Sequence, residues 1–388
     1  MTSAIAVSGG LNGDVRFHNL TNSNCVYVID GGDYNHALCH INKLVSKGST
    51  LAVAGHSWIR IHSLGKLDSA ASVMEGGHSH NVTSVAFQAD EKWFVSSGED
   101  GKLRLWDLRA RGFQLGISHS CAINSATVHP NQGFVVFGDQ EGFVNHFDIA
   151  ANSVVRHKVG EGTGLGVLNV AYDDHNRLIC THDNRYVSLY SDPDSSNRNE
   201  IDCDDSELDF PDDASPRHAL MPPRMIPLIS RSVSGPSHNR SFVGGVHSIT
   251  NLVITPQRYH QFAHDVHKHG YVSNISLSGP ESVRHQALIV SSTDGSLSVW
   301  RTSHDDNLYS LDAHITSGTR TWCSDAKFID DRTRFILSAY SDGKCRVWDT
   351  VRPSITPVSI FDGGCGKSVR SVIVLTSDCV DFSDRRNR

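Results

Sequence analysis

The sequence predicts an all-β protein in which seven four-stranded units close into one ring. The first observation is a short phrase that returns seven times along the chain, in its clearest form as SSGEDGKLRLWDL from Ser96 to Leu108. The second is its spacing, because the tryptophan position of the phrase recurs every 41 to 48 residues, apart from one step of 110. The residues at this position are His18, His62, Trp106, Phe147, Tyr190, Trp300 and Trp348.

A Trp-Asp signature with a period of about 40–45 residues is typical of a WD-repeat β-propeller. A chain of 388 residues would ordinarily suggest two or three domains, but repeated units of this kind share a single annular core. We therefore predict a seven-bladed propeller over residues 1–376, interrupted by an insert at 192–245. Residues 377–388 are expected to form a flexible tail.

The unit that begins at Asn81 shows how one blade is encoded. Asn81–Phe87 alternates apolar and small polar residues, as an inner strand should. The turn GEDG contains Gly101, which is free to adopt a positive φ. The second, third and outer strands are expected at Trp93–Ser97, Leu103–Asp107 and Gly112–Ile117.

The two ends of the chain are complementary in strand content. Three strands precede the first inner strand, which is expected near Ala37, and one inner-type strand, Ser368–Leu375, follows the last full unit. Three strands and one strand make a blade, so we predict that the termini close the last blade together and remove exposed sheet edges. The three N-terminal strands are expected at Ala4–Ser8, Val15–Asn19 and Cys25–Asp30.

The long step of 110 residues contains an insert of unusual composition. Residues 192–213 hold ten carboxylates and one arginine, and the stretch that follows is rich in proline and serine. Low hydrophobicity with high charge cannot offset the entropy of ordering, so the insert is predicted to be disordered. Ile249–Thr255 is expected to supply the outer strand of the interrupted blade.

Charge and composition exclude several classes of protein. The net charge is −7, but without the acidic segment the chain is nearly neutral and shows no basic stripe, which argues against nucleic-acid binding. No apolar run is long enough to span a membrane, and no signal peptide is visible. Nine cysteines without a CxxC pair indicate free, buried thiols. We expect a cytoplasmic protein that does not insert into membranes, peripheral to endomembranes only through its complex.

One set of polar residues in the best unit resembles a hydrolase triad. In WD repeats a histidine, a serine, the turn aspartate and the tryptophan form a hydrogen-bonded network, because a buried indole N–H needs an acceptor. The repeat position of each residue already explains its presence, so we interpret the set as structural. Its members are His78, Ser96, Asp100 and Trp106.

Other candidate sites are weaker. The run GEGTGLG at 160–166 lacks the Lys-Ser/Thr of a phosphate loop, and neither a nucleophile elbow nor a kinase signature is present. We predict no catalytic activity, no cofactor, no metal and no small-molecule substrate. The best histidine cluster has no cysteine and only Asp265 as an acidic partner, so it is interpreted as a solvated loop. Its members are His260, His264, His267 and His269.

The insert also contains a candidate phosphorylation site. Arg231 lies three residues before Ser234, which precedes Gly-Pro. Basophilic kinases and phosphoserine-reading adaptors favour this setting, because arginines grip the added charge. Ser234 is therefore a possible phosphosite, and a chance pattern in a serine-rich segment is the alternative.

Two runs resemble one propeller family in particular. NVTSVAFQADEKWFVSSGEDGKLRLWDLRAR (residues 81–111) and AINSATVHPNQGFVVFGDQEG (residues 122–142) are similar to the G-protein-beta-subunit-like propeller of target-of-rapamycin kinase complexes, as are SVWRTS at 298–303 and TRTW at 319–322. The likeness covers roughly residues 1–190 and 268–376. It implies a non-catalytic ring that binds and stabilises a phosphatidylinositol-kinase-like kinase of the target-of-rapamycin type, with the other subunits of its complex as further partners.

The resemblance directs attention to one face of the ring. Trp322 stands where the family also has a tryptophan and is expected to anchor a partner, with packing between blades as the alternative. Two rival functions remain: a substrate-recruiting adaptor of a ubiquitin ligase or another assembly, with the insert as recruiting arm, and an enzyme with a site in the central channel. The predicted partner-binding face comprises Asn35, His36, Trp58, Asn81, Asp139, Gln140, Asp183, Trp322 and Tyr340.

Overall fold

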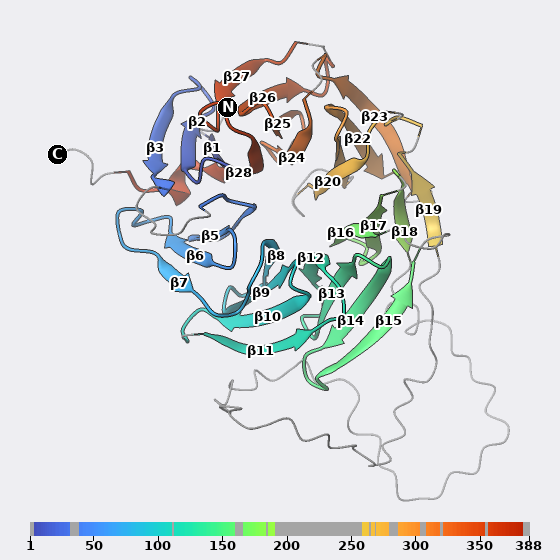
Figure 1. The fold of residues 1–388 in the computed structure, drawn as a ribbon. Helices are drawn as coiled ribbons and strands as arrows, with labels where there is room; N and C mark the ends of the chain where they lie inside the picture. Colours follow the sequence, from blue (N-terminus) through green and yellow to red (C-terminus); the bar gives the residue numbers. More distant parts are fainter. Residues whose placement is uncertain are drawn as a thin grey trace, which may run out of the picture.

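The computed structural model is a ring of seven four-stranded antiparallel sheets, which confirms the predicted seven-bladed propeller (Figure 1). We number the blades 1 to 7 in chain order, and blade 7 contains both ends of the chain. The structure describes residues 4–31, 39–110, 112–159, 166–183, 185–190, 258–263, 265–267, 269–278, 286–302, 308–318, 321–353 and 356–382.

The strands of each blade run from the central channel outward. Blades 1 to 3 consist of β4 (Lys43–Lys47), β5 (Thr50–Ala54), β6 (Ile59–Ser63), β7 (Ser72–Met74); β8 (Val82–Phe87), β9 (Trp93–Gly98), β10 (Lys102–Asp107), β11 (Phe113–Ser118); β12 (Ile123–Val128), β13 (Phe134–Asp139), β14 (Phe143–Asp148) and β15 (Ser153–Lys158). Blades 4 and 5 consist of β16 (Val167–Tyr172), β17 (Leu178–His182), β18 (Val187–Tyr190), β19 (Arg258–Phe262); β20 (Val272–Leu277), β21 (Ala287–Ser292), β22 (Ser296–Thr302) and β23 (Tyr309–Thr316). Blades 6 and 7 consist of β24 (Cys323–Phe328), β25 (Phe335–Tyr340), β26 (Lys344–Asp349), β27 (Ser359–Asp362); β28 (Val369–Thr376), β1 (Ala4–Gly10), β2 (Val15–Asn19) and β3 (Cys25–Ile29).

Blade 2 shows how the residue pattern makes a blade. The two middle strands, β9 and β10, are buried along almost their whole length because neighbouring blades cover both of their faces. The inner strand β8 and the outer strand β11 are only partly buried. All four strands begin and end within one residue of the predicted bounds.

The hydrophobic core lies between blades rather than within them. Trp106 of blade 2 stacks on Phe94 at 5.9 Å between ring centroids, and both belong to one buried cluster with Ala52 and Ile59 of blade 1. Gly77 completes this contact, because a Cβ at its position would lie 2.4 Å from an indole carbon of Trp106. One blade cannot bury its own face, so stability depends on the complete ring.

The two ends of the chain meet in blade 7, as predicted. β28 pairs with β1 from Ala4↔Thr376 to Gly10↔Val369, and β2 and β3 complete the sheet. Beyond β28 a short 3₁₀ turn, Ser377–Cys379, leads into residues that are packed, where a flexible tail was predicted from residue 377. Val380 is buried and Phe382 lies edge-on to Phe17 at 6.2 Å, so residues 377–382 seal the junction between blades 7 and 1.

Side-chain hydrogen bonds join neighbouring inner strands around the channel. In several blades the second residue of the inner strand donates to the carbonyl of the first residue of the next inner strand. Examples are Thr83 to Ile123 (2.7 Å), Asn124 to Val167 (2.9 Å), Ser273 to Cys323 (2.5 Å) and Ser324 to Val369 (2.6 Å). This belt of hydrogen bonds could not be predicted from the sequence, because a lone Ser, Thr or Asn in a strand does not indicate its partner.

We expect Ser324→Ala to lower the free energy of unfolding by about 1–2 kcal/mol, because the carbonyl of Val369 loses its side-chain donor. Urea unfolding of the purified protein measures this change. The control is Ser118→Ala, at the exposed end of β11, which should stay within about 0.5 kcal/mol of the parent. Equal effects of the two substitutions would contradict a role for the belt.

Three expectations are corrected by the fold. The outer strand of blade 4 is β19 (Arg258–Phe262), whereas the predicted segment 249–255 lies outside the described residues. Ala37, near which the first inner strand was expected, also lies outside them, and that strand begins at Lys43. None of the eight described cysteines forms a disulfide within the described residues, but only Cys180, Cys323 and Cys345 are buried. In the part of the chain that the structure describes, no helix is long and apolar enough to cross a membrane.

Candidate interaction face

One face of the ring carries a set of equivalent residues, each directly before an inner strand. Their equivalence is visible in the backbone, because each carbonyl accepts a hydrogen bond from the turn between the second and third strands of its blade. The bonds run from Glu99 to Asn81, from Gln140 to Ala122, from Thr293 to Tyr271 and from Ser341 to Trp322, at 2.9–3.0 Å. These residues therefore surround the mouth of the channel on the same face as the turns.

Two neighbouring members of this set are exposed aromatic residues. Trp322 of blade 6 is 63 % exposed and Tyr271 of blade 5 is 52 % exposed. The guanidinium of Arg185 lies 5.6 Å from the Tyr271 ring centroid. Tyr271 was not among the predicted face residues, although its place directly before an inner strand, like that of Trp322, was a usable signal. Exposed aromatic residues at equivalent positions of adjacent blades are typical of a surface that binds a partner.

Three residues of the predicted face are buried, so the prediction that they contact a partner is wrong. The Trp58 indole folds back over Gly55 and under the guanidinium of Arg60, which lies 4.0 Å from its ring centroid. Tyr340 is fully buried, with its hydroxyl 3.3 Å from the carbonyl of Gly295 in blade 5. Asp139 is also fully buried, and it accepts hydrogen bonds within blade 3. Contacts within the same blade bury Trp58 and Asp139, and a contact with the neighbouring blade buries Tyr340.

The other predicted residues have different surroundings. Gln140 is exposed and Asp183 is partly exposed. Asn81 is half-buried, and its amide donates to Glu99 while its oxygen accepts from Asn42. Asn35 and His36 lie outside the described residues, as does the candidate phosphosite Ser234. Among the nine predicted face residues, Trp322 and Gln140 are therefore the exposed ones that the structure describes.

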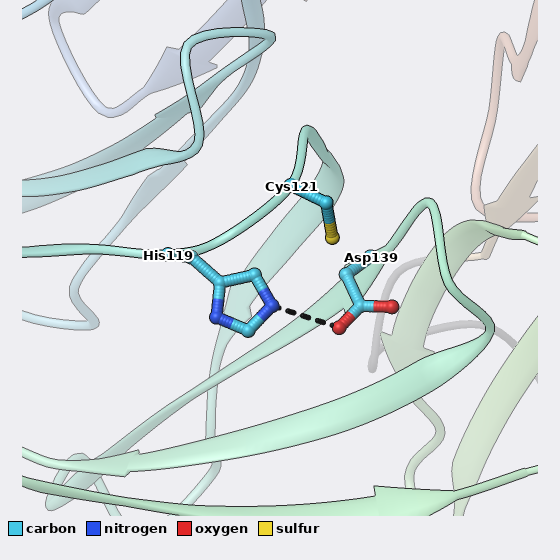
Figure 2. A group of neighbouring side chains, drawn as sticks. All are labelled: His119, Cys121 and Asp139. Atoms are coloured by element: carbon cyan, nitrogen blue, oxygen red, sulfur yellow. Dashed lines mark hydrogen bonds and ion pairs between the residues drawn. The ribbon is translucent and has the colours of Figure 1, made fainter.

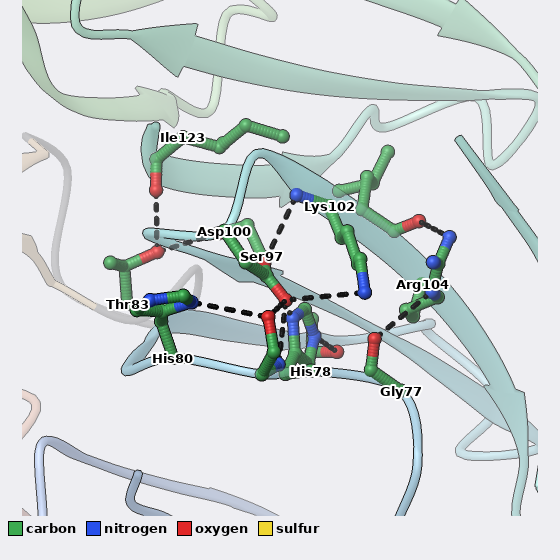
Figure 3. A network of polar contacts seen from close by, with 12 residues as sticks. Gly77, His78, His80, Thr83, Ser97, Asp100, Lys102, Arg104 and Ile123 are labelled. Carbon is green, nitrogen blue, oxygen red and sulfur yellow. Dashed lines mark hydrogen bonds and ion pairs between the residues drawn. The ribbon is translucent and has the colours of Figure 1, made fainter. Parts of the chain in front are cut away.

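The three residues that resemble a hydrolase triad form one buried network with Trp106. Ser96 Oγ accepts the Trp106 indole N–H at 2.8 Å and lies 2.7 Å from Nε2 of His78. Nδ1 of His78 lies 3.1 Å from Asp100 (Figure 3). Burial alone would raise the pKa of Asp100, but hydrogen bonds from His78, Ser79 and Lys102 lower it to about 2. Because Ser96 is fully buried and its oxygen is already an acceptor, the geometry fits a structural role.

His267, one residue of the predicted histidine cluster, belongs to a second buried network of the same kind. His267 lies 2.8 Å from both Ser296 and Ser298, and Ser298 also accepts the Trp300 indole N–H at 2.8 Å. His260 lies apart from it, stacked on Phe262 in β19, and His264 is outside the described residues. His269 lines a surface hollow. The structure therefore disperses the cluster, and the group in the described residues that could hold a metal is a different one, His119, Cys121 and Asp139.

A hollow of about 410 Å³ lies between the inner strands of blades 5, 6, 7 and 1. Lys327 lines it, with Nζ 3.5 Å from the buried carboxylate of Asp325. Burial alone would raise the pKa of Asp325, but the charges of Lys327 and Lys43 and hydrogen bonds from Ser371 and the amide of Val372 lower it. Asp325 therefore ties neighbouring blades together, which is a structural arrangement.

A family model described as "WD domain, G-beta repeat" matches residues 71–107 and 305–349. A crystal structure of the Cps50 (Swd1) β-propeller domain of Myceliophteria thermophila matches with a TM-score of 0.59 and 12 % identity, covering 84 % of this chain and 86 % of that one. At this identity the structural likeness shows the fold alone. Both matches agree with the WD-repeat propeller fold of this chain.

Several curated relatives have a higher sequence identity to this chain than the Cps50 propeller has. "Target of rapamycin complex subunit wat1" of Schizosaccharomyces pombe is 32 % identical over 161 residues, or 41 % of this chain and 50 % of the relative. "Target of rapamycin complex subunit LST8" of Saccharomyces cerevisiae is 32 % identical over 136 residues, or 34 % and 43 %. The mouse protein of the same name is 27 % identical over 195 residues, or 50 % and 52 %. The chain thus spans about half the length of these relatives.

Proposed function

We propose that this WD40-repeat propeller is a non-catalytic scaffold subunit of a target-of-rapamycin-type kinase complex, in which it binds and stabilises the kinase domain. The observation that carries the proposal is the similarity to relatives named as subunits of that complex. The proposal also holds that the direct partner is the kinase and that the propeller stabilises it. The family resemblance and the exposed residues Trp322 and Tyr271 support these two points. As part of the same proposal the protein works in the cytoplasm.

The proposed mechanism is binding alone, without bond-making chemistry. Trp322 and Tyr271 would bury their exposed ring surface against apolar side chains of the kinase, while the polar turn residue Gln140 remains at the rim. A rigid ring is suited to this role, because little conformational entropy is lost when a preformed face docks. The kinase segment held in this way gains stability that rises with the logarithm of the affinity of the contact.

We expect Trp322→Ala to weaken binding of the kinase by about 30-fold or more, since truncating a central aromatic anchor costs at least about 2 kcal/mol. The change should leave the fold intact, because Trp322 is 63 % exposed. Affinity purification of the tagged variant, with the co-purified kinase quantified by mass spectrometry, measures the loss. Thermal unfolding of the purified variant verifies the fold.

The matched control is Val351→Ala, which removes an apolar side chain that is 68 % exposed after β26, at the opposite end of the ring. This variant should retain the kinase. Recovery of ubiquitin-ligase subunits without any phosphatidylinositol-kinase-like kinase would contradict the proposed function and favour the adaptor alternative. Equal kinase recovery with both variants would contradict the proposed face while leaving the complex itself in place.

A further inference from the structure

Blade 3 keeps a histidine at the position of His78 although the network of blade 2 has no counterpart there. The strand registers place Phe137 at the position of Ser96 and Phe147 at the position of Trp106. Blade 3 therefore has no indole N–H to satisfy and no serine to relay it. His119, four residues before β12 as His78 is before β8, needs another explanation.

Three side chains with metal-binding atoms converge at this point. One ligand atom each from His119, Cys121 and Asp139 lies within 4.8 Å of the others (Figure 2). His119 and Cys121 come from the segment between β11 and β12, and Asp139 is the last residue of β13. In blade 2 the register position of Asp139 is occupied by Gly98, so the carboxylate is a feature of blade 3.

The carboxylate of Asp139 is held in a fixed orientation. Its Oδ1 accepts hydrogen bonds from the backbone amides of Glu141 at 3.0 Å and Phe143 at 2.9 Å. Its Oδ2 lies 2.9 Å from Nε2 of His119 and accepts from the Asn145 amide at 3.0 Å. Outer hydrogen bonds of this kind orient carboxylate and histidine ligands in metal sites.

We propose that His119 Nε2, Cys121 Sγ and Asp139 Oδ2 bind one zinc-type divalent ion, with a fourth coordination position open. Imidazole nitrogen, thiolate and carboxylate oxygen are the ligands that zinc takes in proteins. Ligand bonds of about 2.0–2.1 Å in tetrahedral geometry separate the nitrogen and oxygen by about 3.3 Å. The two atoms already lie 2.9 Å apart, so a small outward movement admits the ion.

Binding of the ion releases one proton from the site. The Cys121 thiol releases one proton to solvent as its sulfur bonds to the metal. The imidazole stays neutral, because its proton moves from Nε2 to Nδ1 when Nε2 donates its lone pair to the ion. Asp139 binds as the carboxylate, so the site adds two negative charges to the divalent cation.

One nearby charge opposes the ion. The guanidinium of Arg156 lies 3.2 Å from Asp139 Oδ2 and 2.6 Å from Glu141 Oε2. Its contact with Glu141 can remain when the metal takes Oδ2. Removing the positive charge of Arg156 should therefore tighten metal binding. If His119 and Asp139 form only a hydrogen-bonded pair, the same change should not create tighter metal binding.

The test uses the full-length protein, treated with chelator and titrated with Co²⁺ and then with competing Zn²⁺. We expect one Co²⁺ to bind per chain and to give a thiolate-to-cobalt charge-transfer band in the near ultraviolet. Added Zn²⁺ should displace the Co²⁺ and remove the band. Cys121→Ser should abolish the charge-transfer band, and His119→Ala should weaken binding by at least about 10-fold. Arg156→Gln should tighten it.

The control is Cys365→Ser, which removes an exposed thiol in another blade and should leave the band unchanged. Thermal unfolding separates loss of binding from loss of fold, since Zn²⁺ should raise the melting temperature of the parent and of Cys365→Ser but not of Cys121→Ser. Absence of the band in the parent, or its persistence in Cys121→Ser, would overturn the proposal. Because the purified protein is tested without a partner, the absence of metal binding would overturn this proposal and leave the proposed kinase partner untouched.

Discussion

Ending the chain before Val369 is expected to abolish cooperative unfolding of the whole ring. This truncation removes β28, the inner strand of blade 7, and with it four buried apolar side chains. It also leaves β1 with an unpaired edge, since β1 pairs with β28 over its entire length. Burying a side chain of this type contributes about 1.5–3 kcal/mol, so the loss is comparable to the stability of an ordinary domain. The four residues are Val369, Val372, Ile373 and Leu375.

Differential scanning calorimetry of the truncated protein measures this effect. The parent should show one sharp transition, whereas the truncated chain should show a broad one or none, with increased binding of a hydrophobic dye. A chain that ends after Phe382 is the control, because it keeps β28 and the packed segment behind it. A truncated chain that melts as sharply as this control would show that the ring does not need closure by both termini.

The protein is expected to lose stability steeply between pH 6.5 and pH 4. His18 and His62 occupy tryptophan positions of blades 7 and 1, where burial lowers the pKa of each to about 4. In the unfolded chain these groups titrate near 6.5, so between the two values the unfolded state binds more protons than the folded state. The free energy of unfolding therefore falls as pH falls, by about 3 kcal/mol for each histidine at pH 4.

The substitution His62→Phe tests this directly. Nδ1 of His62 is buried and makes no hydrogen bond with the described residues, and phenylalanine already fills the equivalent position of blade 3 as Phe147. The variant should be as stable as the parent at pH 7.5, or more so. Its slope of unfolding free energy against pH should be smaller by up to about 1.4 kcal/mol per pH unit between pH 6.5 and 4. Parallel curves for parent and variant would refute the assignment.

Much of the fold could be predicted because its determinants lie along the chain. The repeat period indicated seven blades, and alternating apolar residues predicted the strands of blade 2 to within one residue. The count of strands at the two ends predicted the shared blade. The seven tryptophan-equivalent positions were also identified correctly, since the strand registers align His18 and His62 with Trp106.

The candidate sites were harder to predict, because exposure depends on how each side chain packs against residues around it in the folded ring. Trp58 and Trp322 looked alike as tryptophans near turns, yet the first is covered by Arg60 and the second is exposed. The grouping of His119 and Cys121 with Asp139 was missed for a related reason. These residues are separated by a whole strand and turn, and none of the spacings that usually indicate a metal site connects them.

The seven-bladed architecture follows from the amino-acid sequence, because a propeller is specified by local strand patterns repeated at a constant period. Three features could be read only from the folded ring: which turn residues reach solvent, how Phe382 packs behind blade 7, and which polar side chains meet at the end of blade 3. Those outcomes depend on the direction of each side chain against the adjacent blade. That direction is set by packing between segments that a repeat pattern does not relate.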